Sequence, residues 1–287
     1  RLAEDFIQNG LHTCHPRFVD SPIKVACVNT LDHIAADFME ALSRQIERDF
    51  DLQIEWVKER NVRIVNEKNI ATAVRAMQKE APHLVLAFFP DALATTQDEY
   101  LKSQTIAKGI ASHIVYEKTI HDPNAMAQVL LSVLAKTGNT PFILAEPLEY
   151  ADRVVGLDLV RESLTRGDRL VAMARHYRSD GLFERYSLDQ AELDSGEALP
   201  LVVLQKLFPE ELCEGQRIIV HHCGRLPDDV IDKLLRWARV LNSTIYPVEI
   251  RTQDVPQLYA FAEGIEQAPW GSLFRMSSYE ALAVSAE

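Results

Sequence analysis

The first half of the chain alternates short apolar runs with longer amphipathic segments. Residues 23–29 (IKVACVN) form an apolar run suited to a strand that is buried on both faces of a sheet. In residues 31–50, apolar side chains recur every four positions and form one helical stripe: Ile34, Phe38, Leu42 and Ile46. The same patterns predict strands over residues 52–57, 84–89 and 113–116 and helices over residues 70–79, 96–109 and 122–136. This alternation predicts a mostly parallel sheet flanked by helices.

In the second half, three strand patterns follow one another before any helical pattern begins. They cover residues 153–160, 169–175 and 182–187, and short turn-forming links such as Arg-Gly-Asp and Ser-Asp-Gly join them. A helix, a strand, a helix and a strand are then predicted over residues 199–208, 217–221, 227–241 and 243–250. Three antiparallel strands followed by these elements are the order of a ribonuclease-H-like sheet.

Prolines mark the division between the two halves. Pro141 and Pro147 interrupt the connecting segment, so we place the boundary near residue 150. The sequence thus predicts one α/β domain over residues 23–150 and a second over residues 151–287. Residues 1–22, which contain Gly10, Pro16 and Pro22, are expected to form an irregular linker or the remnant of a preceding region.

The composition excludes several classes of protein. With 47% hydrophobic and 25% charged residues among 287, the chain is of globular type rather than disordered, collagenous or disulfide-rich. It contains no run of about 18 consecutive apolar residues, the length that a membrane-spanning helix requires. The opening residues lack a basic-then-apolar leader, and four widely spaced cysteines (Cys14, Cys27, Cys213 and Cys223) are typical of reduced thiols. We therefore expect a cytoplasmic protein without a membrane partner.

The net charge of −12 argues against broad, non-specific binding of nucleic acids, which depends on Lys and Arg meeting phosphates. It leaves room for a local basic pocket, because charges act over a Debye length of about 8–10 Å.

One acidic residue lies inside an apolar strand. Asp158 belongs to the run RVVGLDLV and shares a strand face with Val154, Gly156 and Val160. An ionised carboxylate in such surroundings is costly unless it meets a metal ion or several hydrogen-bond donors. Asp158 is therefore either a strand-end aspartate bound by backbone amides or, in a ribonuclease-H-like sheet, the first metal ligand for two-ion phosphodiester hydrolysis.

Several stretches resemble the MID and PIWI domains of prokaryotic Argonaute proteins, in the correct order over residues 23–287. Residues 100–120 (YLKSQTIAKGIASHIVYEKTI) resemble the guide-binding stretch of MID, and residues 138–162 resemble the beginning of PIWI. The run RIIVHHCGRLPDDVIDKLLRWA resembles the PIWI segment usually written His-Arg-Asp-Gly, and IYPVEIRTQDVPQLYAF and APWGSLFRMSSYEALAVS resemble the strands that follow. The resemblance implies a Rossmann-like MID domain with a parallel sheet, then a ribonuclease-H-like PIWI domain that is incomplete at its C-terminal end.

The resemblance also implies a pocket for the 5′ phosphate of a nucleic-acid guide. The family motif has an aromatic residue or arginine, a lysine four residues later, a glutamine after the helix and a second lysine one helix further on. Lys102 and Lys136 match the two lysines, and His113 stands in place of the glutamine. Two ammonium groups that converge on one phosphate are effective charge-assisted donors. Alternatively, Lys136 is a last-turn lysine that favours the helix dipole and Lys102 is one solvated lysine among many.

Other positions of this pocket are less regular. The aromatic position falls on Asp98, although Tyr100 is close and could stack on the terminal base. Gln104 is assigned to the same pocket, and a Mg²⁺ ion is expected only at the guide phosphate, with no cofactor for catalysis.

The resemblance further implies three acids and a fourth ligand for two catalytic metal ions. Asp158 matches the first, and Glu197, or less favourably Glu192, matches the second. The third should be the acid of His-Arg-Asp-Gly, but Cys223 stands there. A thiol with a pKa of about 8.5 is mostly neutral at pH 7 and is a poor ligand for Mg²⁺ or Mn²⁺. The fourth would lie beyond Glu287, so we expect a catalytically inactive PIWI domain without a metal.

A zinc site is a weaker interpretation of the histidines and cysteines. His221 and Cys223 could share a metal, but His222 points to the other face of its strand. Structural zinc requires four ligands, usually in spaced pairs, which neither this run nor His12-x-Cys14-His15 provides.

These inferences favour a guide-binding MID–PIWI module without nuclease activity, either from a short Argonaute or from a fragment of a longer one. Its expected partners are a short guide RNA or DNA, a complementary target strand for which DNA is favoured, and an associated effector protein. Two alternatives remain open. One is a working guide-directed endonuclease that uses Asp158 and Glu197 with Cys223 as a substitute ligand. The other is an α/β protein that binds a small phosphorylated ligand, although no GxGxxG or GxxxxGK[ST] motif supports it.

Overall fold

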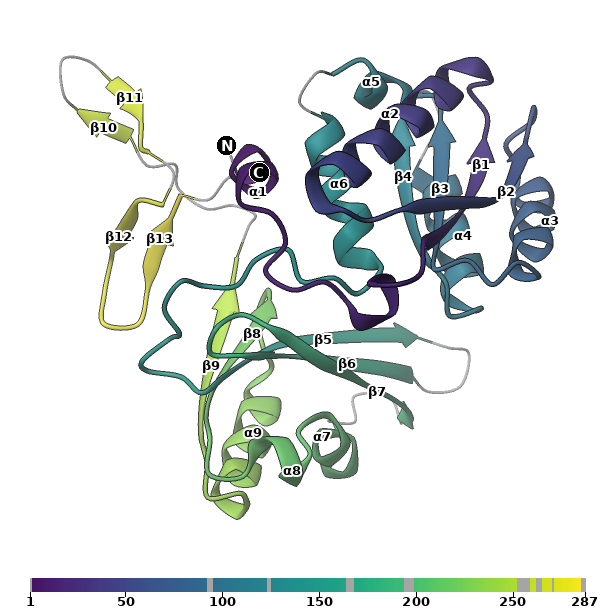
Figure 1. Cartoon of the computed structure of the whole chain (residues 1–287). Coiled ribbons are helices and arrows are strands. Elements are labelled where there is room, and N and C mark those ends of the chain that lie inside the picture. The colour runs from purple at the N-terminus through teal and green to yellow at the C-terminus, as the bar shows by residue number, and fades with distance from the viewer. Residues whose placement is uncertain are drawn as a thin grey trace. The chain divides into compact units, whose positions relative to one another are not determined.

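The computed structural model describes residues 2–91, 95–122, 125–163, 168–193, 199–251, 259–261, 265–269 and 271–284. The chain divides into two compact units, Arg1–Leu144 and Ala145–Glu287, which we describe separately (Figure 1). Within the described residues, no helix is both long enough and apolar enough to cross a lipid bilayer.

The N-terminal unit is built on a four-stranded parallel sheet with the strand order β2-β1-β3-β4. The strands are β1 (Ile23–Asn29), β2 (Ile54–Asn61), β3 (Leu84–Phe89) and β4 (Ala111–Tyr116). The helices of the unit are α1 (Leu2–Asn9), α2 (His33–Phe50), α3 (Glu67–Gln78), α4 (Thr95–Ile106), α5 (Glu117–Ile120) and α6 (Ala125–Lys136). The predicted parallel α/β sheet is therefore confirmed.

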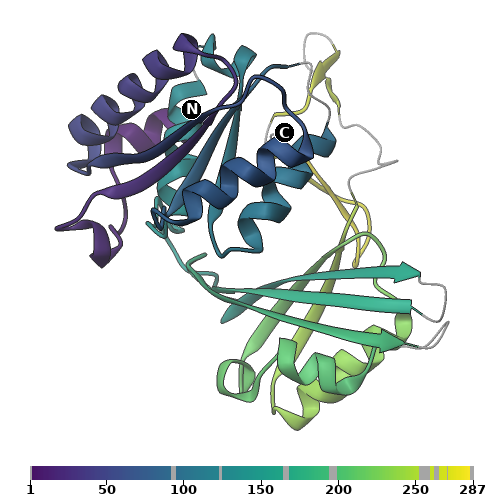
Figure 2. The same ribbon diagram turned by 90° about the vertical axis from the view of Figure 1, so that its right-hand side faces the viewer.

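Two hydrophobic cores hold this sheet between layers of helices. Helices α2 and α6 pack on one face, and α3 and α4 pack on the other (Figures 1 and 2). Strand β3 is buried along its whole length, and its neighbouring residues Phe88 and Phe89 belong to opposite cores. This follows from strand geometry, because successive side chains point to opposite faces of a sheet. An uninterrupted apolar run is what a strand covered on both faces requires.

The prediction of an irregular linker before Ile23 is wrong, because this segment packs into the N-terminal unit. It contains α1 and a short 3-10 helix (Pro16–Phe18), and the side chains of Phe6 and Phe18 are buried in the core beneath α2 and α6. Thr13 pairs with Thr140 in an isolated antiparallel bridge whose two N···O distances are 3.1 and 2.9 Å. The segment had been assigned to a linker because an 8-residue helix and a single 3-10 turn are too short for a clear periodicity.

The C-terminal unit contains a five-stranded sheet with the order β7-β6-β5-β8-β9. Its strands are β5 (Arg153–Ser163), β6 (Asp168–Arg178), β7 (Phe183–Leu193), β8 (Arg217–Cys223) and β9 (Thr244–Ile250). Strands β5, β6 and β7 run antiparallel, whereas β8 and β9 run parallel to β5. This is the strand arrangement expected for a ribonuclease-H-like sheet, so that prediction is confirmed as well. Two short hairpins follow: β10 (Tyr259–Phe261) with β11 (Ile265–Gln267), and β12 (Leu273–Arg275) with β13 (Ala281–Ala283).

Three helices pack against this sheet through one hydrophobic core: α7 (Leu201–Leu207), α8 (Glu210–Cys213) and α9 (Asp228–Val240). Helix α9 shows how the sequence specifies such an element. Pro227 stands at its N-cap, acidic residues lie in its first turn, and Arg239 lies in its last turn, which suits the helix dipole. Its buried side chains recur every four residues, at Val230, Leu234 and Ala238.

Removal of the Phe88 ring should test whether the buried central strand stabilises the N-terminal unit. Phe88 is fully buried, so Phe88→Ala is expected to lower the free energy of unfolding by about 3–5 kcal/mol. Ile106→Ala, at a residue that is 72% exposed, should change it by less than about 0.5 kcal/mol. Urea denaturation of both variants measures the difference, and equal effects would contradict the assigned core.

Candidate nucleic-acid interface

Helix α4 turns buried side chains toward the sheet and a lysine toward solvent. Leu101 and Thr105, one turn apart, are fully buried against the sheet. Lys102 is exposed, and it follows Leu101 by about 100° around the helix. The Thr105 hydroxyl also lies 3.0 Å from that of Ser112 on β4. Lys102 therefore leaves α4 on the side of the free edge of β4, the outermost strand of the sheet.

Lys136, the last residue of α6, reaches the same edge from the other face of the sheet. Its ammonium group donates to the backbone carbonyl of Ser112 at 2.6 Å and lies 3.4 Å from Nδ1 of His113. An edge strand leaves backbone groups without a strand partner, and Lys136 binds one of them. We call the group formed by Lys102, His113 and Lys136 the cationic cradle.

The three side chains of the cradle influence one another's protonation. The pKa of His113 is lowered to about 4 by burial, by the charge of Lys136 and by that of Lys102. Burial and the charge of Lys102 also lower the pKa of Lys136. Because an ammonium group has no lone pair, Lys136 donates to Nδ1 and the neutral imidazole of His113 carries its proton on Nε2. The cradle therefore offers two ammonium groups and one N–H donor.

Two other predicted members of the pocket, Tyr100 and Gln104, lie on another side of α4 from Lys102. Tyr100 precedes Leu101 and packs against the core between the sheet, α3 and α4, on the opposite side of the buried stripe from Lys102. Gln104, four residues after Tyr100, lies on the same side of α4 as Tyr100. Its backbone carbonyl accepts a hydrogen bond from Lys108 at 3.2 Å. Nearness in sequence suggested both residues, and the phase of the helix separates them from Lys102.

Asp98, at the position where the family motif has an aromatic residue or arginine, is bound by a tyrosine that the sequence analysis missed. The hydroxyl of Tyr116, at the end of β4, donates to the Asp98 carboxylate. Burial, this hydrogen bond and the charges of Asp98 and Asp91 raise the pKa of Tyr116 to about 12. Tyr116 thus holds the acid one turn before Lys102. Only its place at the end of a predicted strand, facing the start of α4, could have indicated this role.

In the C-terminal unit, the predicted first metal ligand is engaged in an ion pair. The carboxylate of Asp158 on β5 lies 2.8 Å from the guanidinium of Arg175 on β6. Arg175 is the Cα partner of Gly156, so strand alternation places it on the same sheet face as Asp158. On β8, His221 is the partner of Gly156, which places the exposed Cys223 on this face too. The alternation predicted for Asp158 is therefore confirmed, whereas its arginine partner was not foreseen.

The other predicted acids of the tetrad are Glu197 and Glu192. Glu197 lies outside the described residues. Glu192 is exposed on β7, two strands from Asp158 and four residues, roughly 13 Å at about 3.3 Å per residue, further along the sheet. His222 lies on the opposite sheet face from His221, and its Nδ1–H donates to the carbonyl of Leu157 at 2.9 Å.

Among the described residues, neither the tetrad positions nor the cradle provides a set of ligands for a magnesium ion. Within the described part of the chain, no group of three or more His, Cys, Asp or Glu side chains is arranged to hold a metal. At the tetrad positions, Arg175 already neutralises Asp158, and a thiol is a poor partner for Mg²⁺. The side chains of the cradle are cationic or neutral donors, so they offer an ion no carboxylate oxygen.

Replacing one ammonium group should be measurable at the neighbouring imidazole. Lys136→Met removes a positive charge, so the pKa of His113 should rise from about 4 toward its ordinary value of 6.5, while burial keeps it below that value. Nitrogen–proton NMR of the histidine side chains gives this pKa directly. In the wild type the depressed pKa also means that the free energy of unfolding falls as the pH drops from 6.5 toward 4, because the unfolded state takes up the proton first. Lys68→Met, on the exposed side of α3, should leave the His113 pKa unchanged.

No family model matches the chain. In sequence, it is 28% identical over 172 residues to the Argonaute protein of Aquifex aeolicus, which covers 56% of this chain and 24% of that protein. The chain thus spans about a quarter of the length of this relative.

Solved structures extend the likeness to both units. The crystal structure of A. aeolicus Argonaute matches with a TM-score of 0.70 and 23% identity, over 88% of this chain and 37% of that one. The MID–PIWI domains of an N. crassa Argonaute match with a TM-score of 0.57 and 11% identity, over 80% of this chain and 74% of that one. Marinitoga piezophila Argonaute, solved with a 5′ OH guide RNA, matches with a TM-score of 0.53 and 12% identity, over 86% and 42% of the two chains. In sequence this chain is therefore Argonaute-like, and its fold matches that of the MID–PIWI domains of solved Argonaute structures.

Proposed function

We propose that the N-terminal unit binds the phosphorylated 5′ end of a short nucleic-acid guide at the cationic cradle and presents the guide to a complementary strand. The convergence of Lys102, His113 and Lys136 at the free edge of β4 is the observation that carries this proposal. A 5′-terminal phosphate bears more negative charge than an internal phosphodiester, so it gains most from two ammonium groups.

The cradle is suited to an anion because its two ammonium groups repel each other and disfavour protonation of His113. Burial and then the charges of both lysines favour the neutral form of His113, and burial and the charge of Lys102 lower the pKa of Lys136. A bound phosphate would relieve this repulsion and accept hydrogen bonds from all three side chains. Histidine in place of the family's glutamine still supplies an N–H donor, through Nε2. A Mg²⁺ ion at the guide end would then be held mainly by phosphate oxygens.

Related structures suggest the chemistry of the partners. M. piezophila Argonaute was solved with a 5′ OH guide RNA and also with that guide and a target DNA, and A. aeolicus Argonaute was solved with externally bound siRNA. For this chain we propose a short RNA or DNA guide and a complementary target, with DNA favoured. An effector protein that acts after target recognition is part of the same proposal, because the C-terminal unit is proposed not to cut.

We propose that the C-terminal unit pairs guide and target without cleavage. Asp158 is bound by Arg175, and Cys223 replaces the acid that should bridge two metal ions. A metal would have to displace the guanidinium and then find a second carboxylate. Two-metal hydrolysis needs both ions to stabilise the attacking and leaving oxygens, and Asp158 paired with Arg175 beside the Cys223 thiol is poorly suited to hold them.

Lys136→Ala should weaken guide binding and, with it, the preference for a 5′ phosphate. A hydrogen bond to a charged group contributes about 1.5–3 kcal/mol, so we expect a loss of about ten- to a hundredfold in affinity for a 5′-phosphorylated guide. Affinity for the matching 5′-hydroxyl guide should change much less. Fluorescence anisotropy with both guides, at fixed salt, measures the two constants.

Lys68→Ala is the matched control, because it removes the same charge from an exposed position on α3. If the wild type binds both guides equally, or if Lys68→Ala and Lys136→Ala have the same effect, the assignment of the cradle is wrong.

A cleavage assay tests the proposed lack of nuclease activity. The full chain, loaded with a guide and given a matched target and Mn²⁺, is expected to leave the target intact over hours, because the tetrad positions lack their bridging acid. Gel electrophoresis of the labelled target gives the result. Guide-directed cutting that disappears in Asp158→Ala would show a working endonuclease instead.

A further inference from the structure

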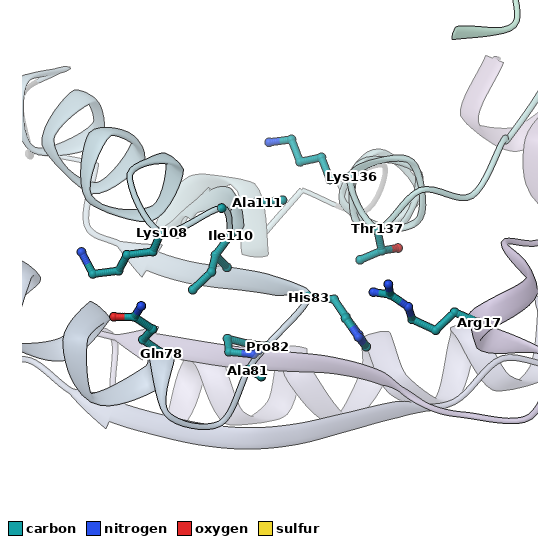
Figure 3. Close-up of a pocket in the computed structure, with 11 residues that line it drawn as sticks. Arg17, Gln78, Ala81, Pro82, His83, Lys108, Ile110, Ala111, Lys136 and Thr137 are labelled. Atoms are coloured by element: carbon teal, nitrogen blue, oxygen red, sulfur yellow. The ribbon is translucent and has the colours of Figure 1, made fainter. Parts of the chain in front are cut away.

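A second basic feature of the N-terminal unit lies beside the cradle, at the edge where β3 and β4 begin. It is a pocket of about 570 Å³ between the ends of α3, α4 and α6 and the 3-10 helix (Figure 3). Arg17 and His83 lie at one end, and Lys108 and Gln78 lie at the other, with Pro82 and Ile110 between them (Figure 3). The volume is that of an ordinary small-ligand site.

The pocket is lined by positive and neutral side chains. Its described lining residues include Arg17, Lys108 and Lys136 but no aspartate or glutamate. In a chain with a net charge of −12, such a lining is a local reversal of sign. Lys136 lies at its rim, and its ammonium group extends away from Arg17 and His83 (Figure 3). Because that ammonium is bound to Ser112 on the side of the cradle, the pocket needs its own cations for a ligand.

Arg17 is held at the pocket by the residues around it. Phe18 is buried in the core, with its ring 5.0 Å from that of His83 in an edge-on contact. The backbone N–H of Arg17 donates to Nδ1 of His15, and the backbone N–H of His15 donates to the buried side chain of Asn139 at 3.0 Å. The backbone of Arg17 is therefore fixed, and its side chain extends into the pocket from an ordered segment.

His83 adds a hydrogen-bond donor next to Arg17. The backbone N–H of Lys24 donates to Nδ1 of His83 at 3.0 Å, so the neutral ring carries its proton on Nε2. Burial and the charges of Arg17, Lys24 and His15 lower the pKa of His83. Arg17 and Lys24 are positively charged, which indicates an electrostatic potential that an anion would reduce.

We propose that this pocket binds a phosphate group, with the phosphate between Arg17 and His83 and the rest of the ligand extending over Pro82 and Ile110 toward Lys108. A guanidinium fork matches phosphate oxygens, and an imidazole N–H adds a further donor. The apolar floor and the second cation at Lys108 suit a nucleotide or a nucleic-acid strand. This site does not depend on the binding of a guide end at the cradle.

Binding of inorganic phosphate to the full chain tests the proposal without any guide. Phosphate added to the wild type should shift the NMR signals of the His83 ring in a saturable manner. Arg17→Ala should lower the affinity by about tenfold or more, because a charge-assisted hydrogen bond is lost. Arg17→Lys should restore only part of it, since a lysine lacks the planar fork.

Arg44→Ala is the control, because Arg44 is an exposed arginine on α2, paired with Glu40, and does not line the pocket. It should bind phosphate as the wild type does. Absence of saturable binding, or equal affinity in Arg17→Ala and Arg44→Ala, would overturn the proposal. Neither variant changes Lys102, His113 or Lys136. A failure of this test therefore leaves the proposed guide binding at the cradle unaffected, and a failure of guide binding leaves the phosphate pocket unaffected.

Two further ligands identify the source of the phosphate. A 5′-hydroxyl oligonucleotide carries only internal phosphodiesters, and a nucleoside 5′-monophosphate carries a single terminal group. Tighter binding of the oligonucleotide, weakened by Lys108→Ala and by added salt, assigns the pocket to a nucleic-acid backbone. Tighter binding of the monophosphate assigns it to a free nucleotide. Competition of either ligand with inorganic phosphate at the His83 signals is expected, and its absence would contradict a shared site.

Discussion

The unpaired side of β4 is the constraint on which the chemistry of the N-terminal unit depends. As the last strand of a parallel sheet, β4 leaves backbone carbonyls without a strand partner, and that of Ser112 accepts the ammonium of Lys136. Helices on opposite faces of the sheet can place side chains around such an edge, whereas an interior strand would separate them. For this reason the charges of both Lys102 and Lys136 act on the pKa of His113. The order of the strands in the sheet, rather than any one sequence motif, thus brings Lys102 and Lys136 to the same edge.

The sequence predicted best those elements whose side chains are apolar on both faces. Strands β1 and β3 have the predicted bounds because each is a continuous apolar run. Strand β2 was predicted to end at residue 57 but continues to Asn61, because its polar second half pairs with β1 at the other edge of the sheet. There Glu59 accepts a hydrogen bond from the buried Asn29 at 2.9 Å, a contact that no hydrophobic pattern reveals. The single-turn helices α5 and α8 are too short for any periodicity.

The residues of the candidate sites also divide into those that the sequence indicates and those that only the structure shows. The resemblance to a family pointed to Lys102 and Lys136, which both act on His113 in the structure, whereas helical phase places Tyr100 on another side of α4 from Lys102. Arg175 could not be assigned to Asp158 before the register of β5 and β6 was known. Arg17 was overlooked because it lies on a single 3-10 turn, whose place in the fold is set by the burial of the next side chain. Residues whose contacts are distant in sequence can therefore be identified only from the structure.

The bridge between Thr13 and Thr140 has a consequence for how the N-terminal unit could be rebuilt. It holds the segment between α1 and β1 against the segment that follows α6, through two hydrogen bonds. Two segments that lie side by side can be joined by a short link while new ends are opened in an exposed loop, which is the basis of circular permutation. A permuted MID-like module, opened away from β4, would keep its sheet order and could be grafted into another scaffold at a single surface position.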